Sequence, residues 1–296
     1  MSDVIAAADQ MTYTATVPWF GGKRTIAPRI VEEIGAHRVY WSLFAGSLAV
    51  ELAKPPAQME TVNDLHGDVT NLARVLRDEA LSGRLYWRLC RTIPAEPLFR
   101  ESLAVLAGGL PPGIDAAPCA DRAYHYFVVC WLGLNGVAGT SRAGSSFAKR
   151  FTSGGGAPAG RFAGAVESIP WWHERLRNVL VLSECGLALA ERIEDRAGTV
   201  VYADPPYLVK AGTYLHDFAA ADHERLARAL RRFRLTRVVV SYYADPRLAD
   251  LYPGWRVVDC AAPKRMAKGG ARPAGGTVAP EVLLVNQPET TPVPRG

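Results

Sequence analysis

A carboxylate, two prolines and an aromatic ring follow one another at Asp204-Pro205-Pro206-Tyr207, directly after the apolar run 199–203. A short β-branched run that stops at such a turn is typical of a buried strand ending at a rigid edge. Proline fixes φ and has no amide donor, so we expect the carbonyls of Asp204 and Pro205 to point outward. Such an edge would offer oxygen acceptors and a ring face to a flat heterocycle with an exocyclic amine. Because Asp-Pro and Pro-Pro are also ordinary turn formers, these residues alone leave a purely structural role open.

Small residues and an acidic residue follow two earlier apolar runs in the same way. Ala45-Gly46-Ser47 comes after the first run, and small side chains there would let the backbone approach a ligand closely. Asp64 ends the second run, where a carboxylate can accept hydrogen bonds from ribose hydroxyls. The structural alternatives are a plain turn at 45–47 and a helix N-cap at Asp64, a role that Asp68 could also fill.

Apolar periodicity assigns these residues to the ends of strands in an α/β sheet. The first part of the chain predicts helices over 23–34, 50–52 and 69–76 and strands over 39–44 and 59–63. The last part predicts strands over 179–182, 200–203 and 237–242, helices over 187–193 and 226–233, and a closing antiparallel pair at 256–260 and 281–286. The order strand, small-residue turn, helix, strand, acidic end indicates a Rossmann-like nucleotide-binding sheet.

The middle of the chain interrupts this alternation. It contains a Pro/Gly-rich stretch at 108–118, one aromatic helix over 123–132 and a glycine-rich basic segment at 135–164. We therefore expect a catalytic domain formed by 17–76 and 176–296, with an inserted, mainly helical and loop-rich domain at 77–175. Residues 1–16 are expected to be a disordered lead-in.

Two basic, glycine-containing segments could contact a polyanion. Their cationic residues are Arg142, Lys149, Arg150 and Arg161 in the first, and Lys264, Arg265, Lys268 and Arg272 in the second. Basic loop residues are usually only solvated. Their clustering with glycine, together with a net charge of +5, favours phosphate contacts here. Asn135, followed by Gly136, is a candidate for base or backbone recognition and almost equally for a simple turn.

Composition excludes several other classes of protein. The 296 residues are 49% hydrophobic and 21% charged, which is ordinary for a globular protein of one large core with a smaller second domain. We see neither a secretory leader nor an apolar run of bilayer length, so we expect cytoplasmic residence and no membrane association. The five cysteines have no paired spacing, which argues against a disulfide framework and a structural zinc site.

With these pieces placed, the chain resembles the Dam-like N(6)-adenine DNA methyltransferases of the alpha group, and it is most similar in texture to phage-borne members. The likeness spans nearly the whole chain and rests on five motifs in order: Pro18 to Lys23, Phe44 to Ser47, Asn63-Asp64, Asn135-Gly136 and Asp204 to Tyr207. It implies S-adenosylmethionine as cofactor, double-stranded DNA as partner, no metal, and residues 77–175 as the target-recognition domain.

The resemblance also implies roles for single residues. The catalytic turn would be Asp204, Pro205, Pro206 and Tyr207. Trp19 and Phe20, otherwise packing residues, would form one wall of the cofactor pocket. The full cofactor-binding set would be Trp19, Phe20, Gly22, Lys23, Phe44, Ala45, Gly46, Ser47, Asp64, Glu184, Cys185 and Asp204. DNA contacts would come from Asn135, Arg142, Lys149, Arg150, Lys264, Arg265 and Lys268.

Three places depart from the family pattern. Ser42-Leu43 stands where members carry Glu-Pro, and Leu48 replaces a further glycine of the loop. Cys185 occupies the place of an aspartate that faces the cofactor adenine, so Glu184 would substitute or the backbone alone would hold that ring. From these departures we expect altered single contacts to the cofactor and a reduced cofactor affinity.

The hypothesis is methyl transfer from S-adenosylmethionine to the exocyclic amine of adenine in duplex DNA. Hydrogen bonds from the amine to Asp204 and the Pro205 carbonyl would stabilise the charge that develops on nitrogen. Flipping the base out costs roughly a few kcal/mol, of which stacking on Tyr207 would return about 1–3 kcal/mol. The alternatives are methylation of the cytosine amine, methylation of RNA, or a DNA-binding relative without turnover. The purpose, whether protection from restriction, host mimicry or regulation, stays open.

Overall fold

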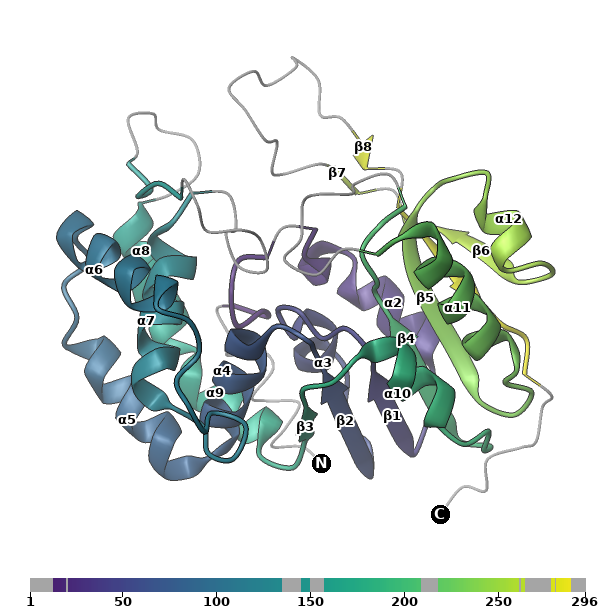
Figure 1. The fold of residues 1–296 in the computed structure, drawn as a ribbon, viewed down its shortest axis with the longest axis horizontal. Coiled ribbons are helices and arrows are strands. Elements are labelled where there is room, and N and C mark those ends of the chain that lie inside the picture. The colour runs from purple at the N-terminus through teal and green to yellow at the C-terminus, as the bar shows by residue number, and fades with distance from the viewer. Residues whose placement is uncertain are drawn as a thin grey trace. The chain divides into compact units, whose positions relative to one another are not determined.

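The computed structural model describes residues 13–19, 21–134, 145–149, 157–208, 218–260, 262–263, 278–279 and 281–288 (Figure 1). The chain forms two compact units that interleave in sequence. Unit 1 consists of Met1–Arg24, Gly46–Pro55 and His66–Val181, and unit 2 of Thr25–Ala45, Pro56–Leu65 and Leu182–Gly296. The expected domain boundaries after residues 76 and 175 stay a prediction.

Unit 2 is built on a seven-stranded sheet with the order β3-β2-β1-β4-β5-β9-β6, to which β3 contributes its last residue from unit 2. The pairs β2–β1, β1–β4 and β4–β5 are parallel, whereas β9 is antiparallel to both β5 and β6. The expected α/β fold with a closing antiparallel pair is therefore confirmed. The strands are β1 (Val39–Ser42), β2 (Met59–Asn63), β3 (Leu180–Leu182), β4 (Thr199–Ala203), β5 (Arg237–Tyr243), β6 (Arg256–Asp259) and β9 (Glu281–Val285).

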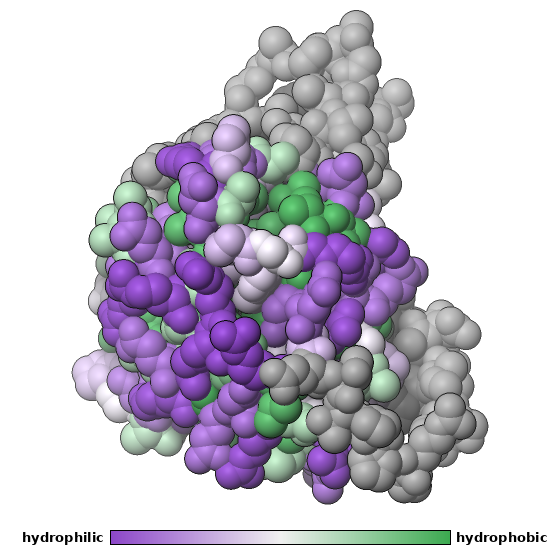
Figure 2. All heavy atoms as spheres, turned by 90° about the vertical axis from the view of Figure 1, so that its right-hand side faces the viewer, coloured by the Kyte–Doolittle hydropathy of each residue, from purple (hydrophilic) through white to green (hydrophobic). Residues whose placement is uncertain are grey.

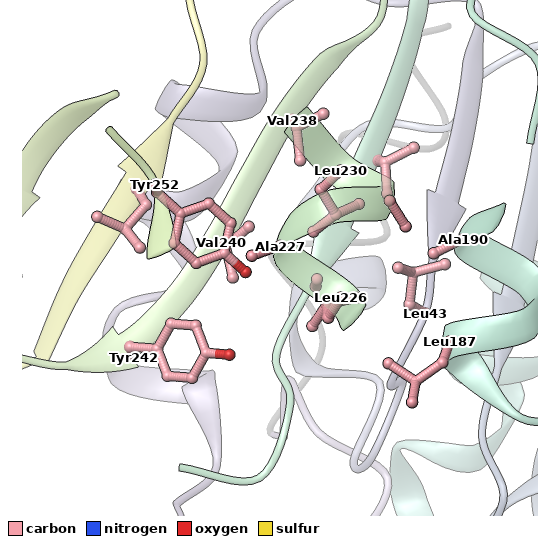
Figure 3. Close-up of a cluster of buried hydrophobic side chains, with 14 of the residues drawn as sticks. Leu43, Leu187, Ala190, Leu226, Ala227, Leu230, Val238, Val240, Tyr242 and Tyr252 are labelled. Atoms are coloured by element: carbon pink, nitrogen blue, oxygen red, sulfur yellow. The ribbon is translucent and has the colours of Figure 1, made fainter. Parts of the chain in front are cut away.

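The central strands are apolar on both sides because helices cover both faces of the sheet. All residues of β4 and β9 are buried, as a sheet covered on both faces requires. On one face, α10 (Gly186–Arg192), α11 (Ala220–Arg231) and α12 (Leu248–Leu251) contribute to a single core cluster (Figure 3). There, Leu226 and Leu230 of α11 pack with alternate residues of β5 such as Val240.

Helix α2 (Ala27–Ile34) packs against β5, and its Ile30 and Ile34 are fully buried. At the end of this helix, Glu33 is 6% exposed and lies among several arginines. Arg256 of β6 donates two hydrogen bonds to its carboxylate, and Arg29 Nη2 lies 3.3 Å from Glu33 Oε1. This ionic cluster ties α2 to the edge of the sheet.

The strand order reverses between β1 and β4. The strands β2 and β3 lie on one side of β1, whereas β4 and β5 lie on its other side. The pair β1 and β4 is therefore the switch point of the sheet. Leu43 N, just past β1, donates to the carbonyl of Tyr202 in β4 at 3.0 Å. The segments that follow β1 and β4 therefore leave the sheet side by side, where open α/β sheets bind their ligands.

Unit 1 is helical and centred on α7 (Ala120–Leu132), whose residues from Arg122 to Leu132 are all buried. Helices α4, α5, α6 and α8 pack against it. The other helices of the unit are α3 (Ala49–Ala53), α4 (Gly67–Arg77), α5 (Glu79–Cys90), α6 (Glu96–Ala107), α8 (Pro158–Glu167) and α9 (Ile169–Leu176), with the short 3₁₀ helix η1 (Lys23–Thr25) at the unit boundary.

A buried ion pair joins three of these helices. Arg122 of α7 contacts Asp68 of α4 through both Nε (2.6 Å) and Nη2 (3.2 Å). The same guanidinium donates to the carbonyls of Val105, Leu106 and Gly109 at the end of α6. One arginine thus pairs a buried carboxylate and satisfies carbonyls that a helix end leaves open.

The segment Tyr13 to Thr16 differs from the disordered lead-in that we expected. Trp172 Nε1 donates to the Tyr13 carbonyl at 2.8 Å, and Trp131 Nε1 donates to the Thr16 carbonyl at 3.0 Å. Two buried indole N–H groups need acceptors, and this segment supplies them. A short two-stranded sheet, β7 (Ala262–Pro263) with β8 (Val278–Ala279), completes the described elements.

The face of unit 2 that carries α12 and β6 is mostly hydrophilic where it is coloured in Figure 2, with apolar side chains in small groups. Val257 of β6, at 61% exposure, is one of the exposed apolar residues of this unit. In the part of the chain that the structure describes, no helix is both long and apolar enough to cross a membrane.

Candidate active site

Asp204 follows β4 directly and its side chain is held by the neighbouring strand. Ser241 of β5 is fully buried, and its Oγ donates to Asp204 Oδ1 at 2.7 Å. The Tyr202 hydroxyl lies 3.4 Å from the same Oγ. The carboxylate is half-buried. Its orientation is therefore set by a residue that lies 37 positions away in sequence and directly beside it in the sheet.

Tyr207, at the end of the turn, is anchored rather than free. Its hydroxyl donates to Glu281 Oε1 at 2.5 Å, and the residue is 5% exposed. Its ring lies 4.3 Å from the ring of Tyr243 and 6.1 Å from that of Tyr242. The hydrogen bond is charge-assisted and joins the turn to the start of β9. Stacking of a base on this ring stays a prediction, because the ring is packed against residues of its own unit.

Two buried side chains near the turn, Tyr242 and His223, are uncharged at neutral pH. Burial raises the pKa of Tyr242 well above its usual value, and burial lowers the pKa of His223. His223 Nδ1 lies 2.9 Å from the Tyr242 hydroxyl oxygen (Tyr242 is labelled in Figure 3). Both side chains are therefore neutral at pH 7, and they lie on the α11 side of β5, the face opposite to Ser241.

Asn63, the last residue of β2, joins the ends of three strands. Its Nδ2 donates to the carbonyls of Leu43 and Glu184, each at 3.0 Å, and its Oδ1 accepts from Glu184 N at 3.0 Å. The Ala45 amide in turn donates to the Asn63 carbonyl at 2.9 Å. The buried amide side chain of Asn63 thus fixes the loop after β1, where part of the cofactor site was predicted.

Phe44 packs closely against Gly186, where an added side chain would force its neighbours to shift. A Cβ added at Gly186 would lie 2.7 Å from Phe44 Cε1 and 3.0 Å from the Leu43 carbonyl, both too close. The Phe44 ring also meets Phe218 edge to face at 5.6 Å. Both rings are half-buried. They form an aromatic surface beside the carboxyl end of the sheet.

Asp64 is half-buried at the carboxyl end of β2. Its strand is two positions from β4 in the sheet, so Asp64 and Asp204 stand about 10 Å apart across the end of β1. An acidic residue at this distance from the switch point suits a ribose. The half-buried rings of Phe44 and Phe218 suit a flat adenine, so these residues of unit 2 fit the adenosine part of S-adenosylmethionine.

The two residues expected to replace the family aspartate are arranged differently from each other. Glu184 Oε1 pairs with Arg192 Nη2 of α10 at 2.7 Å. Cys185 is exposed and comes directly before α10. Contacts from either residue to a cofactor stay predictions.

The predicted cofactor residues of unit 1 also lie close to one another. A Cβ built on Gly46 would lie 3.3 Å from the ring of Trp19, and Gly46 has a positive φ of 51°. Ser47 accepts two hydrogen bonds at its carbonyl from Thr16, one from the amide and one from Oγ1. Lys23 is 5% exposed and donates from Nζ to the Gly21 carbonyl at 2.7 Å. At Gly22, an added Cβ would press on the Trp19 carbonyl at 3.1 Å.

Of the predicted DNA contacts, Lys149 is described, and its Nζ pairs with Glu96 Oε2 at 2.7 Å. Its exposed fraction of 53% leaves the ammonium accessible to solvent. The other predicted DNA contacts lie outside the described part of the chain: Asn135, Arg142, Arg150, Lys264, Arg265 and Lys268. The predicted cofactor residue Phe20 also lies outside it. Among the described residues, no cluster of three or more His, Cys, Asp or Glu side chains could hold a metal ion.

Two residues beside the turn were not singled out from the sequence. Ser241 is a polar residue within the apolar strand 238–242, and Glu281 opens a strand that is buried throughout. A polar or charged residue in a buried strand needs a partner, and this was the available signal. The partners themselves depend on the strand order, which periodicity does not supply.

The sheet order and the acidic and small residues at the strand ends are those of the doubly wound α/β class. Within the chain, residues 19–102 match the family model for D12 class N6 adenine-specific DNA methyltransferases, which is less than a third of the length. A comparison with curated proteins gave no match.

Similar solved structures include three methyltransferases of low identity. One is a precorrin-6y C5,15-methyltransferase from Geobacter metallireducens, with 9% identity and a TM-score of 0.35 over 88% of this chain and 86% of that chain. The second is the putative methyltransferase yhhF from Escherichia coli, with 12% identity and a TM-score of 0.34 over 92% of this chain and 91% of that chain. The third is the rRNA methyltransferase aviRa from Streptomyces viridochromogenes, with 10% identity and a TM-score of 0.36 over 88% of this chain and 82% of that chain. Likeness at these TM-scores does not bear on function.

Proposed function

We propose that the protein is a DNA methyltransferase that transfers a methyl group from S-adenosylmethionine to the exocyclic amine of adenine in duplex DNA, in the cytoplasm. The observation that carries this proposal is the Asp204 carboxylate, held by Ser241 at the end of β4, at the switch point of the sheet. The family match over residues 19–102 supports adenine as the target.

The chemistry asked of the turn is electrostatic. The adenine amine is a weak nucleophile because its lone pair is delocalised into the ring. Hydrogen bonds from the amine to Asp204 and to the Pro205 carbonyl favour a tetrahedral nitrogen and stabilise the positive charge that develops on it. Because Ser241 already orients the carboxylate, little reorganisation is needed when this charge appears.

The residues predicted from the sequence would share the contacts to the cofactor. Asp64 would accept hydrogen bonds from the ribose hydroxyls, and Phe44 would pack on the adenine ring. The backbone at Ala45 and Gly46 would lie against the amino-acid part, with Trp19 beside Gly46. When bound, S-adenosylmethionine supplies the electrophilic methyl group.

Glu281 acts in this proposal as a positioning residue. By accepting from the Tyr207 hydroxyl it fixes the end of the Pro-Pro-Tyr segment, and the two prolines transmit that position to Asp204. Tyr207 therefore has a task that depends on its hydroxyl as well as on its ring.

The test is transfer of tritiated methyl groups to DNA by the wild type and by Asp204→Ala. We expect Asp204→Ala to lose about 10²–10³-fold in rate, as loss of one preorganised charge-stabilising group usually costs. Asp250→Ala, an exposed carboxylate on α12, is the matched control and keeps full activity. Equal incorporation by wild type and Asp204→Ala would remove Asp204 from the mechanism.

Nucleoside analysis of the product separates N6-methyladenine from N4-methylcytosine. A competition between RNA and DNA substrates shows which of the two polymers the enzyme methylates. Calorimetry with S-adenosylmethionine addresses the binding-only alternative, which the altered glycine-rich loop at Ser42-Leu43 and Leu48 motivates. Absence of heat at millimolar cofactor would favour that alternative and contradict the proposal.

A further inference from the structure

Helix α5 of unit 1 carries a basic and aromatic surface that has no part in the site above. It borders an open hollow of about 1050 Å³. The residues that line the hollow, called the α5 surface from here on, are Arg84, Trp87, Arg88, Arg91, Thr92, Ile93, Leu98 and Tyr124. Three of these described lining residues are cations and none is acidic, so the hollow suits an anionic partner.

The arginines form a row along one side of the helix. Arg84 and Arg88 are four residues apart on one face of α5, and Arg91, the C-cap residue of the helix, follows three residues after Arg88. All three are exposed. From the helical rise, the row from Arg84 to Arg91 is about 10 Å long. Phosphates on one DNA strand follow one another every ~3.4 Å along the helix axis, so the row spans about three of them.

The central arginine is already fixed in position. The Arg88 guanidinium lies 3.6 Å from the centre of the Tyr124 ring, and its Nη1 contacts Asp121 Oδ1 at 2.5 Å. Thr92 Oγ1 lies 3.0 Å from the Tyr124 hydroxyl and donates to the Arg88 carbonyl. A guanidinium held in this way loses less conformational entropy when it binds a phosphate.

Large apolar side chains flank the row. Trp87 is 60% exposed and Ile93 81% exposed. The macrodipole explains arginines in the last turn of α5 but explains neither Arg84, which lies before that turn, nor an exposed indole. A positive groove with an accessible aromatic ring is the usual composition of nucleic-acid-binding surfaces, where the ring packs on sugars or bases.

We propose that the α5 surface binds the phosphodiester backbone of duplex DNA outside the recognition sequence. The inference rests on the proposed function only in taking DNA as the partner. Arg84 and Arg91 contact successive phosphates on either side of the fixed Arg88, and Trp87 covers the adjoining sugars. These contacts add affinity that does not depend on base sequence.

The experiment measures binding of fluorescent duplexes by anisotropy over a series of salt concentrations. The full-length protein, the double variant Arg84→Gln/Arg91→Gln and the control Arg228→Gln/Arg231→Gln are compared on a long duplex and on a short one. The short duplex holds only the recognition sequence, which is first identified by modification-detecting sequencing of DNA methylated by the wild type. The control removes the same charge from exposed residues of α11 in unit 2. Because every substitution is at an exposed position, we expect all variants to unfold at the wild-type temperature.

On the long duplex, the α5 variant should lower the slope of log K against log salt by about 1.8, because each phosphate that an arginine no longer neutralises changes it by about 0.9. That change corresponds to a loss on the order of 10–100-fold in affinity at 0.1 M salt. The control should leave the slope unchanged, and Trp87→Ala should weaken binding several-fold without changing the slope. On the short duplex, the α5 variant should bind like the wild type.

An unchanged slope for the α5 variant on the long duplex would overturn the proposal. An equal loss of affinity on both duplexes would also overturn it, because the phosphates bound would then lie within the recognition sequence. A third contradicting result would be that the α5 variant binds DNA like the wild type but no longer binds an acidic protein partner. The two proposals fail separately. Methyl transfer with an unchanged slope defeats the α5 surface alone, whereas the expected slope change without methyl transfer by the wild type defeats the catalytic proposal alone.

Discussion

Asp68 in unit 1 and Glu281 in unit 2 are both buried carboxylates, at 3% and 9% exposure, but their partners differ in charge. Asp68 is paired with the guanidinium of Arg122, which is itself buried and also bonds three carbonyls of the α6 end. Glu281 accepts from the neutral hydroxyl of Tyr207. The described partner of Asp68 is thus a full countercharge, whereas the described partner of Glu281 is a dipole.

The difference predicts different consequences of removal. Without Arg122, Asp68 would be left buried without this countercharge, and α4, α6 and α7 would lose their common link. Without the Tyr207 hydroxyl, Glu281 would lose one donor near the edge of the sheet, and the main effect would fall on the turn that Tyr207 ends. We therefore expect the first interaction to determine stability and the second to determine activity.

The largest effect should come from Arg122→Leu. Removing one partner of a buried ion pair costs about 3–5 kcal/mol, and this arginine also caps a helix. Urea unfolding of the variant measures the loss. Asp121→Asn, which breaks the exposed Arg88–Asp121 pair, is the control and should cost less than about 1 kcal/mol. Equal losses for the two variants would mean that the buried pair contributes no more than a surface pair.

Glu33 is an intermediate case between Asp68 and Glu281. Its carboxylate is buried, but the arginines that pair with it, Arg29, Arg237 and Arg256, are one-third to one-half exposed. The hydrogen bond from Arg256 holds the pKa of Glu33 below its usual value. A depressed folded-state pKa stabilises the fold above the unfolded value of about 4.3, and this contribution is lost as the pH falls through the folded value.

At pH 7, Glu33→Gln should therefore lower the unfolding free energy by roughly 2 kcal/mol, less than for a fully buried pair because solvent screens the arginines. The difference from wild type should shrink below about pH 4. Glu32→Gln, one residue earlier and exposed, should show little change at either pH. A pH-independent loss for Glu33→Gln would assign the effect to packing and not to charge.

The smallest effect on stability, about 1–2 kcal/mol, should come from Tyr207→Phe, which keeps the ring and removes the hydroxyl. Methyl transfer is the more sensitive measurement. If Glu281 positions the turn through this hydroxyl, kcat should fall about tenfold, or 1.4 kcal/mol, while the KM for S-adenosylmethionine stays the same.

Glu281→Gln retains an acceptor and should lose less than Tyr207→Phe. The double variant should lose little more than Tyr207→Phe alone, because both changes affect one hydrogen bond. Full activity of Tyr207→Phe would instead indicate that the ring serves only as a stacking surface.

Periodicity predicted the sheet well because its strands are short apolar runs with clear ends. The strand expected over 59–63 is β2 (Met59–Asn63), and those expected over 200–203 and 237–242 correspond to β4 and β5. The strand expected over 39–44 ends at Ser42, because Leu43 to Ala45 turn to bond with Asn63 and Tyr202. Local pattern is a good guide where burial follows alternation.

The contacts that orient the site could not be predicted in this way. Asp204 meets Ser241 across 37 residues, and Tyr207 meets Glu281 across 74. Both depend on β4 lying beside β5 and β5 beside β9, which is a property of the whole sheet. In the middle of the chain, only the helix at 123–132 was expected individually. The amphipathic helices around it alternate with Pro/Gly-rich connections, which weaken the pattern.

Among the described residues outside glycine, Leu48 alone has a positive φ, at 58°, and its side chain is 1% exposed. A left-handed leucine costs about 1–3 kcal/mol in backbone strain, and burying its side chain returns about 1.5–3 kcal/mol. Glycine at this position would be free of the strain but would forgo the burial, so the two residues are nearly equivalent in free energy. Leucine and glycine can therefore replace each other at position 48 without a change in the shape of the loop. A sequence motif that requires glycine at this position would fail to detect proteins with the same loop.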